Sequence, residues 1–235
     1  MLQPGVSLRV ISATNALLLC DSVLVSPSET PVAVATDWLE PIRRRLAEFE
    51  RQSIAKANLR PAAVAFTLVD EREGPAFILT QRSRTLSRHA GQFALPGGRL
   101  DPGETPVVAA LRELEEEIGL ALPEAHVLGC LDDFETRSGF CMTPVVLWGG
   151  SEPALCADPA EVGAIHRIPL AALEREALVD LWPIPQSDRP VLSMQLGELR
   201  IFAPTAALIY QFREVALFGR TTRVAHYEQP LFAWS

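Results

Sequence analysis

The segment TPVVAALRELEEEIGL, residues 105–120, constrains the fold of this chain more than any other stretch. Thr105 followed by Pro106 is typical of a helix start, because the hydroxyl caps free N–H groups and proline has no N–H that needs a partner there. Gly119 is typical of a helix end. The segment therefore predicts a helix from about Pro106 to Ile118. The apolar positions that would dock this helix on a sheet are Val107, Val108, Leu111, Leu114 and Ile118.

Three glutamates of this helix, Glu113, Glu116 and Glu117, stand at i, i+3 and i+4 and share one face, which we expect to point away from the main core. Like charges at this spacing destabilise a bare helix by a few tenths of a kcal/mol per pair, and the negative end of the helix dipole adds to this cost. A divalent cation such as Mg²⁺ would offset the repulsion, because it prefers oxygen ligands. The alternative is a solvated acidic face that Arg112, four residues before Glu116, partly neutralises.

The surroundings of the three glutamates favour the metal site. Five residues separate Gly98 from Glu104, seven separate Glu104 from Arg112, and RELEEEIGL begins at Arg112. This spacing matches the Nudix box, G-x5-E-x7-R-E-U-x-E-E-x-G-U with U a bulky aliphatic residue, at every defined position. The chain therefore resembles the Nudix hydrolases over about residues 62–170.

This resemblance implies an α/β fold, namely a Nudix-type α/β/α sandwich with a mixed sheet, and hydrolysis of a nucleoside diphosphate linked to another group. It implies that Glu113, Glu116 and Glu117 bind Mg²⁺ or Mn²⁺ and that the Gly98 carbonyl adds a ligand. Such ions lower the pKa of bound water and neutralise phosphate oxygens, so that water can displace one phosphoryl group in line.

The resemblance also assigns roles to the residues around these ligands. Arg112 would orient the carboxylates, and Glu104 would support the loop and the helix from behind. A glutamate would take the proton of the attacking water, and Glu116 is the first candidate. Glu161, in DPAEVGAIHRIPL, is the second, because several Nudix groups place a base or a ligand on a later loop. The alternative for Glu161 is a surface acid before a strand.

Upstream of the box, LTQRSRTLSRHAGQFALPGG, residues 79–98, resembles the coenzyme A diphosphatase signature, L-L-T-x-R-[SA]-x3-R-x3-G-x3-F-P-G-G. The resemblance implies that Arg82, Ser83 and Gly97 bind substrate, with Arg82 contacting phosphate. Two positions depart from the signature: Ser87 stands in place of the second arginine, with Arg88 one place later as its substitute, and Leu95 stands in place of phenylalanine. Two further segments, TRSGFCMTPVV (136–146) and QPLFAW (229–234), also resemble this group.

Three hypotheses for the function follow. The first is metal-dependent hydrolysis of coenzyme A or acyl-CoA to 3',5'-ADP and a 4'-phosphopantetheine product. The second keeps the chemistry and changes the nucleotide substrate to ADP-ribose, NADH or a dinucleoside polyphosphate, and the Ser87 departure is its support. The third is a nucleotide-sensing module without catalysis, which the complete set of glutamates disfavours.

Composition excludes some partners. The net charge is -8 and Lys56 is the only lysine, so the chain lacks the basic stripe that nucleic-acid binding uses. The longest apolar run near the start, residues 16–20, is too short to span a bilayer, and no signal-peptide pattern frames it. The four cysteines show no C-x-x-C spacing. These features predict a cytoplasmic protein with reduced thiols and no membrane partner.

The chain divides into an N-terminal extension, residues 1–56, and a Nudix domain, residues 57–235. The extension has strand-like pieces at 8–11 and 32–35 and a helix that an Asp37–Glu40 capping box would begin. Its role is open between covering the active site, a homodimer contact and an extension of the sheet. The domain would contain a hairpin at EREG (71–74), a second hairpin around Gly197, and a helix at about 204–218.

Overall fold

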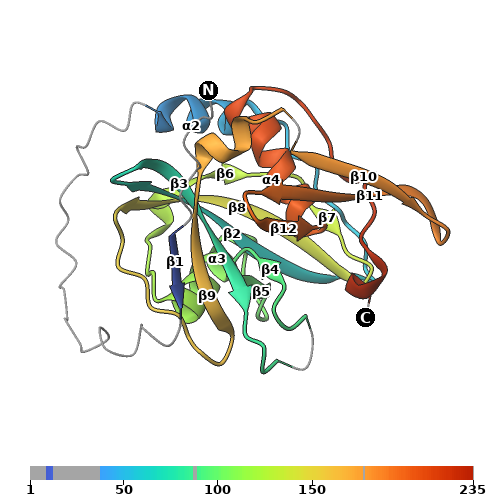
Figure 1. The fold of residues 1–235 in the computed structure, drawn as a ribbon, viewed down its shortest axis with the longest axis horizontal. Helices are drawn as coiled ribbons and strands as arrows, with labels where there is room; N and C mark the ends of the chain where they lie inside the picture. The colour runs from blue at the N-terminus through green and yellow to red at the C-terminus, as the bar shows by residue number, and fades with distance from the viewer. Residues whose placement is uncertain (1–8, 13–37, 87–88, 177, 235) are drawn as a thin grey trace.

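The computed structural model describes residues 9–12, 38–86, 89–176 and 178–234 (Figure 1). Its helices are α2 (Leu39–Glu48), α3 (Pro106–Ile118) and α4 (Thr205–Phe212), with short turns η1 (Glu124–His126), η2 (Leu170–Glu174), η3 (Arg213–Leu217) and η4 (Leu231–Ala233). Its strands are β1 (Arg9–Ser12), β2 (Arg60–Glu71), β3 (Gly74–Arg82), β4 (Phe93–Ala94), β5 (Gly97–Arg99), β6 (Val127–Cys130), β7 (Phe134–Glu135), β8 (Phe140–Ser151), β9 (Val162–Pro169), β10 (Val179–Ile184), β11 (Ser187–Leu196) and β12 (Leu199–Phe202).

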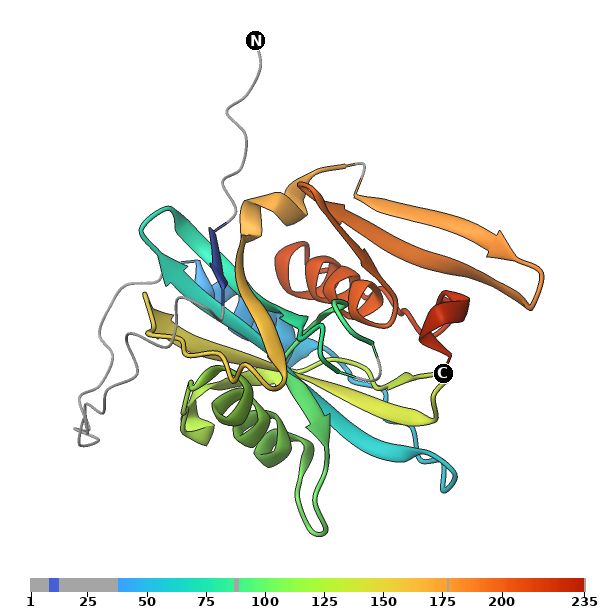
Figure 2. The same ribbon diagram turned by 60° about the horizontal axis from the view of Figure 1, so that its bottom comes forward.

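The larger sheet has the order β1-β9-β3-β2-β8-β6, with β4, β5 and β7 paired at its sides. It is mixed, because β2 and β8 run parallel while the other pairs are antiparallel. Helix α3 covers one face, and α2 and α4 cover the other (Figure 2). The α/β/α sandwich with a mixed sheet is therefore confirmed.

Strand β2 supplies both cores, because successive side chains of a strand point to opposite faces. Ala63 and Ala65 join the cluster that includes α3, whereas Val64 and Phe66 join the cluster on the other face. The Phe66 ring stacks on Phe212 of α4 at a centroid distance of 4.0 Å. The central strand thus fixes α3 and α4 to opposite sides of one sheet.

Helix α3 has the predicted bounds. The Thr105 hydroxyl accepts the Val108 N–H at 3.3 Å, and Gly119 ends the helix in the left-handed conformation at φ 70°. The predicted apolar stripe is wrong at Val108, which is 38% exposed, while Ala109 and Ala110 are fully buried because their small side chains let the helix approach the sheet.

Helix α2 begins at Leu39, and the predicted capping box falls on Asp37, outside the described residues. The N-cap of the helix is Trp38, which makes no side-chain cap hydrogen bond, while the strand-like piece at 32–35 also lies outside the described residues. Leu39, Ile42 and Leu46 are buried in the same cluster as α4, and β1 pairs antiparallel with β9. These parts of the N-terminal region therefore pack on the rest of the fold.

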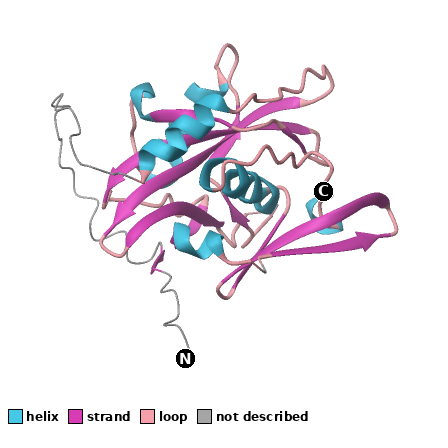
Figure 3. Cartoon of the chain, turned by 90° about the horizontal axis from the view of Figure 1, so that it is seen from above, coloured by secondary structure: helices cyan, strands magenta, loops and turns pink. Residues whose placement is uncertain are grey.

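A second sheet, β10-β11-β12, stands beside α4. Figure 3 shows α4 between the two sheets. The predicted hairpins at 71–74 and around Gly197 are confirmed as β2–β3 and β11–β12. Strand β10 was not expected. The predicted helix at 204–218 is α4 continued by the π-helical turn η3, and Gly219 follows at φ 67°.

One expectation about the cysteines is wrong: Cys156 is disulfide-bonded, whereas Cys130 and Cys141 are free. A C-x-x-C search detects only pairs that are close in sequence, so it gives no sign of a disulfide over a longer separation. Among the described residues, none of the helices has the length and apolar character needed to cross a bilayer.

Candidate active site

A cavity of about 550 Å³ opens where α3, β2 and β5 meet. Its walls also include the end of β3, the start of β8, the start of α4 and part of the C-terminal segment. Three carboxylates line it: Glu113 and Glu116 from α3, and Glu161 from the turn before β9. The fold therefore brings a residue 45 or more positions downstream to the glutamates of the helix.

Arg112 connects the acidic side chains on this side of the cavity. Its Nη1 donates to Glu113 Oε1 and to Glu116 Oε2, both at 2.9 Å. Its Nε and Nη2 donate to the two oxygens of Glu104 at 2.9 and 3.1 Å, and Nη2 also reaches the Arg99 carbonyl at 3.0 Å. The guanidinium is therefore fixed by β5 and by the loop before α3. It in turn fixes the carboxylates of Glu113 and Glu116.

The expectation that all three glutamates point away from the core is wrong for Glu117, which is 4% exposed. The i+4 position turns this side chain toward β5, where its Oε1 accepts the Gly97 N–H at 3.3 Å. Burial raises the pKa of Glu117 to about 8, against the opposing effects of this hydrogen bond and of the positive charge of Arg82. Burial also raises the pKa of Glu113. For Glu113 the hydrogen bond and the charge of Arg112 oppose this effect of burial.

Gly98 provides a test of whether a cation fits. A Cβ at this position would lie 2.2 Å from Glu113 Oε1, so only glycine lets the carboxylate pack this closely against the β5 backbone. Within the described ranges, no three His, Cys, Asp or Glu side chains converge as a ready ion site, because Arg112 draws Glu113 and Glu116 to its own guanidinium. The carboxylate oxygens beside the β5 backbone are donors that suit a hard divalent ion.

The structure places some residues of the upstream signature in the cavity and others outside it. Arg82 lines the cavity, and its Nε is buried without a hydrogen-bond partner among the described residues. Gly97 also lines the cavity. Ser83 does not, because its hydroxyl is paired with Thr85 at 2.9 Å and its N–H donates to the Glu161 carbonyl at 2.8 Å. Arg88 lies outside the described residues.

Sequence reasoning assigned no role to the remaining wall of the cavity. This wall is uncharged and comes from the loop before β8, the start of β8, the start of α4 and the C-terminal segment; its members include Thr136, Ser138, Phe140, Met142, Thr205 and Gln229. Two segments that contribute to this wall, 136–146 and 229–234, resemble the coenzyme A diphosphatase group, and this resemblance is the sequence feature that points to the wall. Their joint position became visible only in the fold.

Comparison with known proteins agrees with this architecture. The NUDIX domain model matches residues 58–192. Two relatives carry the name Uncharacterized Nudix hydrolase NudL. The one from Escherichia coli O7:K1 (strain IAI39 / ExPEC) is 35% identical over 185 residues, 77% of this chain and 92% of the relative. The one from Yersinia enterocolitica serotype O:8 / biotype 1B is 40% identical over 157 residues, 65% and 80% of the two chains.

Among solved structures, a MutT/nudix family protein from Enterococcus faecalis is 18% identical with a TM-score of 0.41, over 72% of this chain and 63% of that one. The NUDIX domain of Shewanella oneidensis NrtR complexed with ADP ribose is 24% identical with a TM-score of 0.38, over 50% and 76%. The domain match and the relatives place the protein among enzymes that hydrolyse phosphoric anhydride bonds. The chain belongs to the Nudix hydrolase family.

Proposed function

We propose that this protein hydrolyses the diphosphate bond of coenzyme A or acyl-CoA to 3',5'-ADP and (acyl-)4'-phosphopantetheine. The observation that carries the proposal is the position of the segment 79–98. Its two ends, Arg82 and Gly97–Gly98, line the same cavity as Glu113 and Glu116. The unpartnered Nε of Arg82 is a donor that a phosphate oxygen would satisfy.

Nudix enzymes generally use a divalent metal ion, and the donors here fit one. In our proposal Glu113, Glu116, Glu117 and the Gly98 carbonyl hold Mg²⁺ or Mn²⁺. The bound ion supplies charge neutralisation at phosphate and a lowered pKa of water. Because Glu117 is buried and Glu113 half-enclosed, their raised pKa values fit carboxylates that are completed by a cation.

Within this proposal the protein side chains have separate tasks. Glu116 is the first candidate to take the proton of the attacking water, because its side chain is 58% exposed yet held by Arg112. Glu161 is the second candidate, and it lines the same cavity from the turn before β9. Arg112 orients Glu113 and Glu116, Glu104 fixes Arg112, and Arg82 contacts the substrate phosphate.

One observation favours a second candidate function. Ser87 replaces an arginine of the coenzyme A signature, and a guanidinium binds phosphate in a way that serine cannot. A Nudix pyrophosphatase acting on ADP-ribose, NADH or a dinucleoside polyphosphate would keep the same catalytic groups and would not need this arginine.

The test is product identification by mass spectrometry after the purified protein is incubated with coenzyme A and Mn²⁺ or Mg²⁺. We expect 3',5'-ADP and 4'-phosphopantetheine, and we expect neither after EDTA treatment nor with Glu116→Gln. Absence of turnover on coenzyme A, together with AMP from ADP-ribose or NADH, would support the second candidate. Absence of turnover on every nucleotide would support a sensing module without catalysis.

A further inference from the structure

We propose that Arg137 and Glu228 form a positioning ion pair that shapes the uncharged wall of the cavity, and that this wall binds the neutral, amide-bearing arm of the substrate beyond its diphosphate. The inference rests on the proposed function, because it takes the cavity as the catalytic one and the phosphopantetheine arm as the ligand. Arg137 and Glu228 would then determine specificity without touching the reacting atoms.

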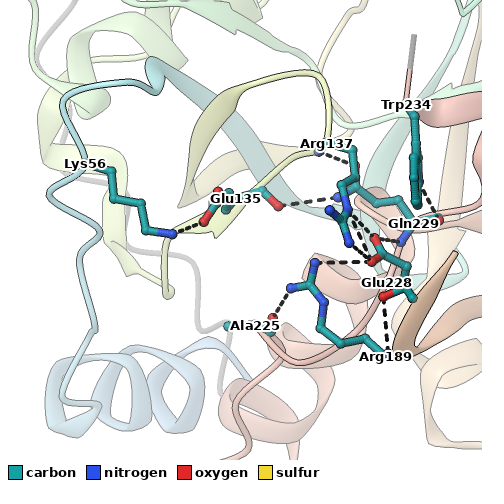
Figure 4. Close-up of polar contacts among 9 residues, drawn as sticks. Lys56, Glu135, Arg137, Arg189, Ala225, Glu228, Gln229 and Trp234 are labelled. Atoms are coloured by element: carbon teal, nitrogen blue, oxygen red, sulfur yellow. Dashed lines mark hydrogen bonds and ion pairs between the residues drawn. The ribbon is translucent and has the colours of Figure 1, made fainter.

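The pair joins a partly exposed arginine to a buried carboxylate through several hydrogen bonds (Figure 4). Glu228 is fully buried, and Arg137 Nε donates to its Oε1 at 3.0 Å and its Oε2 at 3.2 Å, while Nη2 gives a further bond to Oε2. Arg189 from β11 donates to the same Oε2 at 3.2 Å. Burial alone would raise the pKa of Glu228, but the hydrogen bonds and these cations lower it to about 2. The carboxylate is therefore ionised at neutral pH.

The location of Arg137 links this pair to the cavity. Its two chain neighbours, Thr136 and Ser138, line the cavity, whereas its own guanidinium points toward Glu228 and lies 4.6 Å from the centre of the Trp234 ring. An arginine at this position would otherwise present a positive charge to the substrate. Because Glu228 engages it, Arg137 adds no unpaired charge to the segment 136–142 of the wall.

Gln229 connects the ion pair to the cavity wall, because it contacts both. This residue lines the cavity and is 1% exposed. Its Oε1 accepts the Arg137 N–H at 3.3 Å, its Nε2 donates to the Glu135 carbonyl at 3.4 Å, and its carbonyl accepts the Trp234 indole N–H at 2.9 Å. The amide is therefore held at both ends, next to a carboxylate whose own oxygen accepts the Gln229 N–H at 2.9 Å.

The chemistry of the wall defines what it binds. Elsewhere the cavity is lined by the charged groups Arg82, Arg99, Glu113, Glu116 and Glu161, which suit a diphosphate and a cation. Of these, the Arg99 guanidinium lies 5.2 Å from the centre of the Phe140 ring, where the charged part meets the wall. The wall near Gln229 has Phe140, Met142 and Ala233 together with hydroxyl groups and one fixed amide. Such a surface favours an uncharged chain with amide groups, because its apolar side chains can cover the methylene groups and its neutral polar groups can pair with the amides.

The test is product inhibition of coenzyme A hydrolysis in the full-length metal-loaded enzyme. We expect Arg137→Ala and Glu228→Gln each to raise Ki for 4'-phosphopantetheine and KM for coenzyme A about tenfold, while kcat changes less than about threefold and Ki for 3',5'-ADP less than about twofold. Gln229→Met should show the same selective loss, and it keeps the ion pair in case the other variants fold poorly.

Arg189→Ala is the matched control, because it removes a cation from the same carboxylate but belongs to β11 outside the cavity wall. We expect nearly unchanged inhibition constants in this variant. Equal rises in both inhibition constants, or the same defect in Arg189→Ala, would overturn the proposal. Opposite effects of Arg137→Ala and Glu228→Gln would also overturn it, because they would show that Arg137 itself contacts the substrate. Failure of the wild type to hydrolyse coenzyme A would instead overturn the proposed function, and the wall proposal with it.

Discussion

Arg112 and Glu104 are joined by two hydrogen bonds, from Nε to Oε1 at 2.9 Å and from Nη2 to Oε2 at 3.1 Å. The remaining terminal nitrogen of Arg112 bridges Glu113 and Glu116. Glu104, in the loop before α3, thus holds the guanidinium plane of Arg112, which in turn fixes the positions of the Glu113 and Glu116 carboxylates. The three glutamate partners raise the pKa of Arg112, so its charge is permanent.

Replacing Arg112 with lysine should uncouple these groups. A lysine ammonium keeps the charge but cannot present a planar fork to Glu104 and bridge two other carboxylates. We expect kcat/KM to fall about 10- to 100-fold, as is usual when a partner of a metal ligand is removed. Steady-state kinetics measures this effect, with Arg43→Lys on the exposed face of α2 as the control. Retention of full activity would show that the network has no role in turnover.

Alanine substitutions at the two adjacent glycines of β5 should have different effects, one on activity and the other on stability. In Gly98→Ala the three atoms nearest to the new Cβ would all belong to the end of the Glu113 side chain, so we expect the fold to persist while metal affinity and kcat fall. In Gly97→Ala the Cβ would lie 2.3 Å from the Ala63 carbonyl oxygen. That backbone clash should lower the free energy of unfolding by about 2 kcal/mol. Manganese titration and urea denaturation distinguish the two, and an unaffected Mn²⁺ affinity in Gly98→Ala would contradict the proposed site.

Arg82→Ala should weaken substrate binding. If its guanidinium contacts a substrate phosphate, its loss should raise KM about tenfold, which corresponds to one charge-assisted hydrogen bond. The neighbouring Arg84 is exposed and does not line the cavity, so Arg84→Ala is a matched control with the same change in net charge. Equal KM values for the two variants would show that Arg82 does not bind phosphate.

His166→Leu should stabilise the protein and alter its response to acid. His166 is 4% exposed, and both ring nitrogens lack hydrogen-bond partners within the described part of the chain. Burial lowers its pKa, so the folded state favours the neutral ring while the unfolded state takes up a proton near pH 6.5. Stability should therefore fall as the pH drops below about 6.5.

The leucine variant should gain about 1 kcal/mol of unfolding free energy at pH 7 and lose this acid-dependent component. Urea denaturation at pH 7 and at pH 5.5 measures both effects. If the wild type and the leucine variant lose the same free energy of unfolding between these pH values, His166 is not the source of the acid dependence.

Much of the fold could be predicted where the signals are local. Thr105, Pro106 and Gly119 determine the bounds of α3 through groups within one turn of each end, and the structure has the same bounds. The turn residues before Gly74 and at Gly197 likewise predicted two hairpins. The helix face was predicted less well, because periodicity places Glu117 beside its neighbours but does not reveal that β5 covers it.

The candidate site was predicted only in part for the same reason. The carboxylates and Arg112 are close in sequence, so their spacing defines their geometry. The Arg137–Glu228 pair joins residues 91 positions apart, and no local pattern indicates such a contact. The hydroxyl of Ser83 was assigned to the substrate from its position in the signature, yet a neighbour two residues away, Thr85, binds it.

The measurement that tests the account most directly is a competition for the enzyme between coenzyme A and ADP-ribose, present at equal concentrations with Mn²⁺. The ratio of the initial product rates gives the ratio of the two kcat/KM values. The account predicts that 3',5'-ADP and 4'-phosphopantetheine form first, and that Glu116→Gln abolishes both. Predominant AMP from ADP-ribose would contradict the assignment of coenzyme A as the substrate and would show that the arm beyond the diphosphate is a sugar.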